Sequence, residues 1–424
     1  MCARWACVVF VVELLLRWEI GRRTLVKGYA EKLVELEEVC NGMEDERLHY
    51  VRPVREEDVE ARVRFYLGDL WYECARDGGE CPPEDEIEET LRELGPAIDE
   101  FTFDRIQRFS AADPARHPPD GVLKRVLLDK RSKYNLDLLE LIEGAGGLED
   151  VDFYVKFGDA SGPAPHAFPF LGKARRQGGG PPGTEPILMK MLRTRHFRLL
   201  TSAENGIPFS RRKDAAVWRG GTTGHRMAYL GAAEKQQQEG AGATLVSAPA
   251  GQPAIRTTGP PKMHPRASLV TRMSEWEQSG GLIDVGVTEY VQNIPPLWGW
   301  KLRISMQGMA SYKMIIQAEG NDVSSGLKWS LLSGSAVVMP PPRIDSWAME
   351  STLVPWVHYI PVDVDFGNLV ERAQWCVDNP AQCEVIARQG ACHMAKFLDE
   401  ESDEHVVNQV LHRVANILAK YDSL

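Results

Sequence analysis

The second half of the chain alternates between short apolar strands and helices, and no other sequence feature constrains the fold as strongly. Strands are expected over residues 282–287, 312–318, 336–339 and 357–361, and a helix over 325–333. This alternation is typical of a parallel sheet whose connecting helices cover its faces. The sequence therefore predicts an α/β fold, with the better-defined sheet domain beginning near residue 206.

The earlier part of the chain is expected to begin with helices. Apolar residues at three- and four-residue spacing predict helical segments at 28–39, 86–109 and 136–142. Two strands are expected, an alternating one at 151–157 and a buried one at 215–218. Gly and Pro predict a loop over 161–186, and the low-complexity stretch 231–265 predicts a flexible insertion.

Two helices are expected at the end of the chain. Asn379 is a good helix cap, with Pro380 in the first turn and Gln382 at the capping-box position, and this helix is expected to run to Leu398. The last helix has a single apolar stripe between residues 406 and 421. Such a stripe indicates packing against a core rather than a cofactor site.

Composition and missing motifs exclude several functions. The chain has 49 Lys and Arg against 60 Asp and Glu, so its net charge of −11 disfavours nucleic-acid binding. No apolar run is long enough for an ordinary membrane-spanning helix. The phosphate-binding loop of nucleotide hydrolases, the dinucleotide fingerprint, the serine nucleophile elbow and the zinc-protease helix are all absent. Asp363 and Asp365 are interpreted as an acidic loop before a helix.

The eight cysteines and the N-terminus leave alternatives open. Cys74 and Cys81 are seven residues apart, as are Cys376 and Cys383, so two local disulfides are conceivable, and no zinc-type spacing occurs. Eight cysteines allow 105 pairings, so the remaining connectivity cannot be deduced. The apolar stretch 5–16 is consistent with a buried amphipathic helix, a late-starting gene model or a weak signal segment.

Two glycine-containing loops follow expected strands and precede helical stretches. The first contains Arg219, Gly220, Thr222, Thr223 and Arg226, and the second contains Glu319, Gly320, Ser324 and Lys328. Free backbone N–H groups, hydroxyls and cations at such positions suit phosphate oxygens. Since parallel strands end at the same edge of a sheet, we expect the two loops, and with them Arg219 and Lys328, to converge on one site. A plain glycine turn and a simply capped helix are the competing interpretations.

Several strings in these loops and beyond them resemble one enzyme family. They are Trp218-Arg219-Gly220, Tyr312-Lys313, Glu319-Gly320, Ser324, Leu331-Leu332, Ser333-Gly334-Ser335 and Leu353-x-Pro355-Trp356-Val357-His358-Tyr359-Ile360-Pro361-Val362. The chain resembles the CAP10-like, lipopolysaccharide-modifying glycosyltransferases of family 90, which include protein O-glucosyltransferases and capsule xylosyltransferases. The resemblance is firm over residues 214–397 and faint over 151–170.

The resemblance implies a GT-B-like fold, in which two Rossmann-like domains face a cleft. It implies boundaries at 1–112 for a helical N-terminal region, 113–205 for an acceptor-side domain, 206–400 for a UDP-sugar-binding domain and 401–424 for a C-terminal helix. The implied reaction moves glucose or xylose from a UDP-sugar to a hydroxyl of a protein or glycan, with inversion and without a metal or other cofactor. Relatives work in the lumen of the endoplasmic reticulum or Golgi, and a membrane anchor at the N-terminus would agree with that location.

The resemblance also implies a catalytic base and a donor site. The base is an aspartate shortly after a strand, which is Asp159 in this sequence, with Asp152 as the alternative. The loops containing Arg219 and Ser324 would hold the leaving diphosphate. The chain departs from the family at Gly326, where many relatives carry Arg, and at residues 160–163. A non-catalytic UDP- or glycan-binding descendant of the family is therefore the alternative function.

Overall fold

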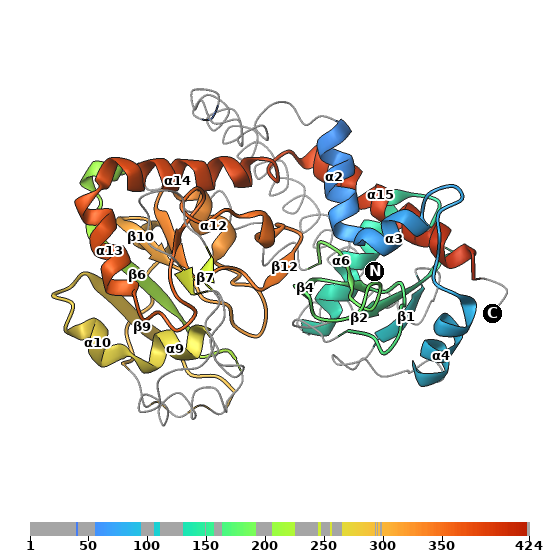
Figure 1. Cartoon of the computed structure of the whole chain (residues 1–424), viewed down its shortest axis with the longest axis horizontal. Coiled ribbons are helices and arrows are strands. Elements are labelled where there is room, and N and C mark those ends of the chain that lie inside the picture. Colours follow the sequence, from blue (N-terminus) through green and yellow to red (C-terminus); the bar gives the residue numbers. More distant parts are fainter. Residues whose placement is uncertain are drawn as a thin grey trace, which may run out of the picture.

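The computed structural model describes residues 40, 56–94, 106–110, 130–148, 150–156, 163–191, 206–224, 245–246, 255–256, 265–292, 294, 296 and 299–421. Figure 1 shows two main sheets with their helices, one on each side of the molecule. Helix α14 (Pro380–Ala395) runs along the sheet that contains strands β6 (Lys213–Gly221), β9 (Ile283–Glu289) and β10 (Tyr312–Ile316), and α15 (Glu400–Ala419) lies beside the sheet that contains β1 (Ile106–Ser110) and β2 (Asp152–Lys156). The predicted segments 5–16 and 28–39 and the predicted site residues Asp159 and Arg226 lie outside the described residues.

The larger sheet is a five-stranded parallel sheet, as the strand–helix alternation predicts. Its order is β13-β11-β10-β6-β9. The strands are β6 (Lys213–Gly221), β9 (Ile283–Glu289), β10 (Tyr312–Ile316), β11 (Ala336–Met339) and β13 (Ile360–Pro361). Every residue of β10 and β11 is buried, which is typical of central strands covered on both faces. The expected strand at 357–361 is reduced to two residues because Trp356, in the left-handed region, forms a turn whose N–H bonds Tyr359 O at 2.8 Å.

Helices cover both faces of this sheet. On one face Trp218 and Met314 pack with residues of α9 (Pro265–Thr271), α10 (Met273–Glu277) and α13 (Leu369–Asp378). On the other face Val217 and Ile315 pack with Met309 of α11 (Met306–Met309) and with Trp329 of α12 (Leu327–Leu332). Alternate residues of β6 and β10 thus contribute to two separate cores, which fixes the register of these strands.

The smaller sheet has the order β1-β2-β3-β5. Its strands are β1 (Ile106–Ser110), β2 (Asp152–Lys156), β3 (Leu171–Gly172) and β5 (Ile187–Leu188). β2, β3 and β5 are parallel, and β1 is antiparallel to β2. The expected helix over 86–109 is wrong at its end, because helix α4 (Glu84–Leu94) ends well before residue 109 and residues 106–110 pair with β2 instead. The expected loop over 161–186 likewise contains β3 and β4 (Ala174–Arg176), short strands that depend on distant partners.

Among the described residues, the helices that accompany the smaller sheet are α2 (Glu56–Leu67), α3 (Asp69–Cys74), α4 (Glu84–Leu94), α6 (Lys130–Ala145) and α15. The predicted apolar stripe of α15 is confirmed as core, since Val406, Val410 and Val414 are buried against α2 and α6. Asn379 precedes α14 as expected, but its side chain donates to Trp375 O instead of capping, and the helix ends at Ala395.

Three disulfides are present among the described residues. Cys74–Cys81 and Cys376–Cys383, the two conceivable local pairs, are confirmed with Cα–Cα distances of 4.6 and 5.2 Å. The third joins Cys40 to Cys392 of α14 across a sequence separation of 352. Within the predicted insertion 231–265 the structure describes only β7 (Leu245–Val246), β8 (Ile255–Arg256) and the first residue of α9. None of the described helices is long and apolar enough to cross a membrane.

Candidate functional site

The two predicted loops meet at the carboxyl edge of the five-stranded sheet. A Cβ atom at Gly320, after β10, would lie only 2.5 Å from Thr223 Oγ1, after β6. Gln292 joins the same loops, since its Oε1 accepts from Gly224 N at 2.8 Å and its Nε2 donates to Asn321 Oδ1 at 3.1 Å. The expected convergence of the loops is therefore confirmed, and Gly320 is a residue whose lack of a side chain permits the close approach.

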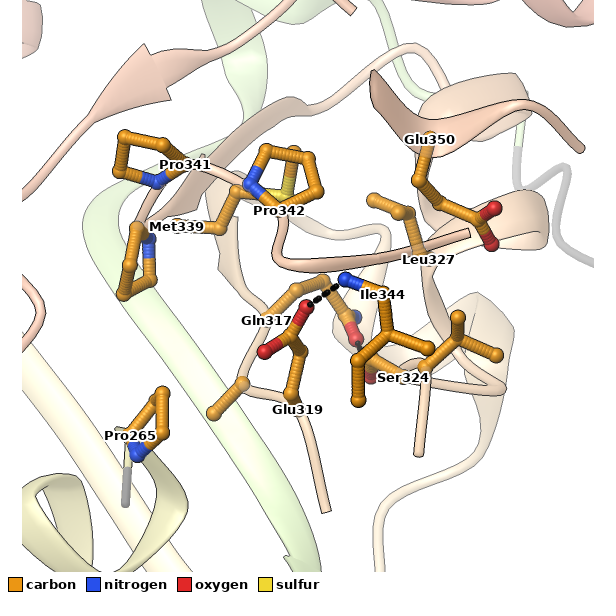
Figure 2. A pocket seen from close by; sticks show the side chains of 13 residues that line it. Pro265, Gln317, Glu319, Ser324, Leu327, Met339, Pro341, Pro342, Ile344 and Glu350 are labelled. Atoms are coloured by element: carbon orange, nitrogen blue, oxygen red, sulfur yellow. Dashed lines mark hydrogen bonds between the residues drawn. The ribbon is translucent and has the colours of Figure 1, made fainter. Parts of the chain in front are cut away.

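A small cavity lies beside the second loop, and Figure 2 shows its lining. Its polar groups include the side chains of Gln317, Glu319 and Ser324, and Met339 and Pro341 are among the apolar residues facing them. These residues come from the end of β10, the following loop and the end of β11. Open α/β sheets bind ligands at this edge, so the cavity marks the candidate site.

Glu319 connects the cavity to the segment before β12 (Ile344–Ser346). Its carboxylate accepts from Arg343 N at 2.7 Å, Ile344 N at 3.1 Å and Arg343 Nε at 3.1 Å. Burial raises the pKa of Glu319, and Arg343 and the two backbone N–H groups oppose that rise. The predicted ligand-binding residue Glu319 therefore fixes the cavity wall through these three hydrogen bonds.

Ser324 lies in a chain of hydrogen bonds at the start of α12. Its hydroxyl donates to Gln317 Oε1 at 2.6 Å, and Gln317 Nε2 donates to Ser330 Oγ at 2.8 Å. The Ser324 oxygen keeps lone pairs that can accept a further hydrogen bond. Ser324 thus lines the cavity, and its predicted role in binding a UDP-sugar stays a prediction.

Lys328 makes a buried ion pair with Glu350. Its Nζ lies 2.5 Å from Glu350 Oε1, and both side chains are at most 2% exposed. Glu350 also accepts from Ser346 N and Ser346 Oγ, each at 2.7 Å. Figure 2 shows the aliphatic part of Glu350 toward the cavity and its carboxylate turned away. Lys328 therefore neutralises a buried carboxylate behind the cavity wall.

Arg219 is bound to the edge strand β9. Its guanidinium contacts both carboxylate oxygens of Asp284 at 2.9 and 3.0 Å and Asp284 O at 2.8 Å. Lys301 Nζ and Tyr312 Oη also reach Asp284, at 2.8 and 3.1 Å. Despite partial burial, these partners lower the pKa of Asp284 to about 2. The loops converge as predicted, but the cations of Arg219 and Lys328 are each paired with a different carboxylate.

The remaining residues of the first loop have mixed roles. Thr222 is fully buried and bonds the backbone of Val291, accepting from its N–H at 2.9 Å. Gly220, like Arg219, lies within β6 and not in the loop, because the strand continues to Gly221 in pairing with β9, and a Cβ at Gly220 would lie 2.5 Å from the Trp218 ring. Thr223 lies against Gly320 and so faces the meeting point of the loops. Of this loop, Thr223 therefore lies next to the second loop, and its contact with a ligand stays a prediction.

The carboxyl ends of the two sheets approach each other near this site. Lys173, directly after β3, forms an ion pair of 2.7 Å with Asp322 of the loop after β10. Strand β4 pairs with β12 in antiparallel fashion, which also joins the two halves. Lys156, the last residue of β2, is in register with Gly172, next to Lys173. Asp152, the alternative base, begins β2 and so lies at the opposite end of that strand.

Sequence reasoning missed Arg266 of α9, whose guanidinium reaches both loops. It donates to Thr223 Oγ1 on the first loop, to Gly221 O at the end of β6 and, at 2.8 Å, to Ala318 O beside the second loop. Arg266 directly follows the predicted insertion, so no expected strand or motif drew attention to it. The Pro265-Arg266 pair before an apolar run, a typical helix start, is the signal that could have identified it.

The sequence model of glycosyl transferase family 90 matches residues 183–422, more than half of the chain. The chain belongs to glycosyl transferase family 90. It is 31% identical over 115 residues to O-glucosyltransferase LpsA of Dichelobacter nodosus, covering 27% of this chain and 36% of that protein. It is also 41% identical over 87 residues to uncharacterized protein 027R of Frog virus 3, covering 19% of this chain and 9% of that one. With protein O-glucosyltransferase 2 of Danio rerio the identity is 33% over 87 residues, or 20% and 17% of the two chains. Each match thus spans little more than a third of the relative, or less.

The family strings have clear structural positions in this family 90 chain. Trp218-Arg219-Gly220 lies within β6, with Trp218 in the core. The string from Pro355 to Pro361 forms the turn that leads into β13, and within it His358 Nδ1 accepts from Val354 N at 2.9 Å. Asp363 and Asp365 lie in the loop before α13, as interpreted from the sequence. Within the described ranges, no group of three or more His, Cys, Asp or Glu side chains could hold a metal ion.

Proposed function

We propose that this chain is a glycosyltransferase that moves glucose or xylose from a UDP-sugar to a hydroxyl of a protein or glycan. Membership of glycosyl transferase family 90 supports the reaction class, and two relatives named as O-glucosyltransferases support transfer to oxygen. In this proposal residues 206–400 bind the donor and residues 113–205 form the acceptor side of a GT-B-like cleft. Inversion at the anomeric carbon and independence of a metal or other cofactor belong to the same proposal.

The observation that carries the proposal is the meeting of the loops after β6 and β10 beside the cavity. Thr223, Gly320 and Ser324 bring a hydroxyl, a bare backbone and a second hydroxyl to one edge of a parallel sheet. Such groups accommodate the polar oxygens of a nucleotide sugar and approach them closely. The Lys173–Asp322 contact puts the end of β3 beside this edge, as a cleft between two sheets requires.

Asp159 is the proposed base. An inverting transfer needs one carboxylate to take the proton of the acceptor hydroxyl while its oxygen attacks the anomeric carbon and the diphosphate leaves. The chain reaches Asp159 three residues after Lys156, the end of β2 that lies next to Gly172 and Lys173. Asp152 is less suitable, because it begins β2, whereas the opposite, carboxyl end of this strand is the end near Asp322 and the candidate site.

A non-catalytic UDP- or glycan-binding protein of the same family is the alternative. Two observations favour it: Arg219 is engaged by Asp284, and Lys328 by Glu350, so neither cation is held at the cavity for a diphosphate. In addition, Gly326 stands where many relatives carry Arg. A Cβ at this position would lie 3.0 Å from Gln317 Oε1, so a side chain here would crowd Gln317. A lumenal location in the endoplasmic reticulum or Golgi is part of either version of the proposal.

The experiment is a screen of UDP-glucose, UDP-xylose and other UDP-sugars, with UDP release and thermal stabilisation measured on the same samples, each with and without EDTA. An enzyme stabilised by a UDP-sugar will also release UDP slowly with water as acceptor, and EDTA will not change the rate. Stabilisation by about 2.7 kcal/mol is expected at 100 times the dissociation constant. Stabilisation without release would favour the binding protein, and neither effect with any UDP-sugar would refute both the transferase and the UDP-binding form of the alternative.

A further inference from the structure

Resting on the proposed function, the geometry points to Arg266 as a positioning residue that holds the two donor loops at a fixed spacing. Arg266 is the second residue of α9, and its guanidinium extends to the place where the loops after β6 and β10 meet. It acts through these loops and is not assigned a contact with the transferred sugar.

Its hydrogen bonds divide between the loops. Nη1 donates to Thr223 Oγ1 and to Gly221 O, and Nη2 donates to Ala318 O at 2.8 Å. One rigid, planar group therefore fixes the first loop with one nitrogen and the second with the other. A lysine at this position has a single nitrogen and cannot reproduce such a fork.

The close approach of the loops makes this fork sensitive to spacing. A Cβ on Gly320 would lie 2.5 Å from Thr223 Oγ1 and 2.9 Å from Arg266 Nη1. The three residues are therefore in contact, and a methyl group on the second loop would have to push Arg266 or Thr223 away. Gly320 thus permits the close approach of the two loops, and the Arg266 guanidinium bridges them.

Arg266 is itself well anchored. Ala267, Leu269 and Val270 of α9 are buried in the core beneath the sheet, and Pro265 lines the cavity. The helix cannot shift without disturbing this core. The Arg266 guanidinium therefore holds both loops at a fixed position relative to the sheet. Loops held in place before the ligand arrives do not have to be ordered on binding, which favours affinity.

The test compares Arg266→Lys with Arg272→Lys and Thr223→Val in the full-length protein. Arg272 is the matched control, because its guanidinium hydrogen-bonds Glu275 and Asp365 O instead of either loop. Dissociation constants for UDP, and KM and kcat for the best UDP-sugar, are measured together with amide hydrogen exchange of residues 219–224 and 318–322 without ligand.

For Arg266→Lys we expect faster exchange in both loops and a dissociation constant and KM raised about tenfold, with kcat changed less than threefold. Thr223→Val should raise KM as well. In the double variant Arg266→Lys/Thr223→Val, the increase in KM should be less than the product of the two single increases, because both changes break the same contact. Arg272→Lys should change none of these. Unchanged loop exchange and KM in Arg266→Lys would overturn the inference. If wild-type protein binds no UDP-sugar, the proposed function fails, and the exchange measurement still decides whether Arg266 orders the loops.

Discussion

Replacing Lys328 by Met should destabilise the protein strongly, because it leaves a buried carboxylate without its cation. Glu350 is 2% exposed, and its other hydrogen bonds come from Ser346 N and Ser346 Oγ, both neutral donors. Removing one partner of such a pair costs about 3–5 kcal/mol. Met conserves most of the apolar volume of the Lys side chain, so little of the loss should come from packing.

The size of this loss can be separated from general damage to the core. Arg388 and Glu384 form an exposed pair with side chains 54% and 35% accessible, and Arg388→Met should cost no more than about 0.5 kcal/mol. The double variant Lys328→Met/Glu350→Gln should recover part of the stability, since no buried charge is then left unpaired.

The assay is chemical unfolding followed by tryptophan fluorescence, with the disulfides intact. A loss below about 1 kcal/mol in Lys328→Met, equal to that of the exposed control, would refute the reasoning. Folded Lys328→Met should still bind UDP, because the Lys328 ammonium group of the wild type is paired with Glu350 and not with the ligand. A selective loss of UDP binding with unchanged stability would instead assign Lys328 to the donor.

Two further results are expected. Burial and, to a lesser degree, the neighbouring charge of Glu350 raise the pKa of Asp345 to about 6, above its usual 3.8. The folded state therefore favours the protonated acid, and the free energy of unfolding should fall as pH rises from about 4 to 6. Thermal unfolding at pH 4, 5, 6 and 7.5 measures this dependence, which Asp345→Asn should flatten. Peptide mapping under non-reducing conditions should recover Cys40 linked to Cys392, and Ser at both positions should cost about 4–5 kcal/mol because the link closes a long loop; a free thiol at either residue would contradict the pairing.

Strands with a strong local pattern could be predicted from the sequence. Residues 336–339 form β11 as expected, and 312–318 contain β10, because their apolar runs lie between turn residues and are buried on both faces. The strand at 106–110 could not be predicted, because its partner β2 is some forty residues away and nothing local distinguishes it from a helix. The two-residue strands β3 and β5 likewise depend on neighbours rather than on their own composition.

The candidate site was predictable in its loops but not in its charges. Polar residues after parallel strands predict a shared edge, and the contact between Gly320 and Thr223 confirms it. Which carboxylate an arginine or lysine binds depends on residues brought together only by the fold, so the pairs of Arg219 with Asp284 and of Lys328 with Glu350 had no sequence signal. The same applies to the disulfide between residues 40 and 392.

The central claim is that this family 90 chain transfers a sugar from a UDP-sugar with Asp159 as base. Single-turnover release of UDP from the UDP-sugar that binds best tests it most directly, in wild type, Asp159→Asn and Asp152→Asn. The account predicts that Asp159→Asn binds the donor normally but reacts about 10²–10⁴-fold more slowly, while Asp152→Asn stays near the wild-type rate. A wild-type rate in Asp159→Asn would contradict the assignment of the base, and no release of UDP by the wild type would contradict the transferase itself.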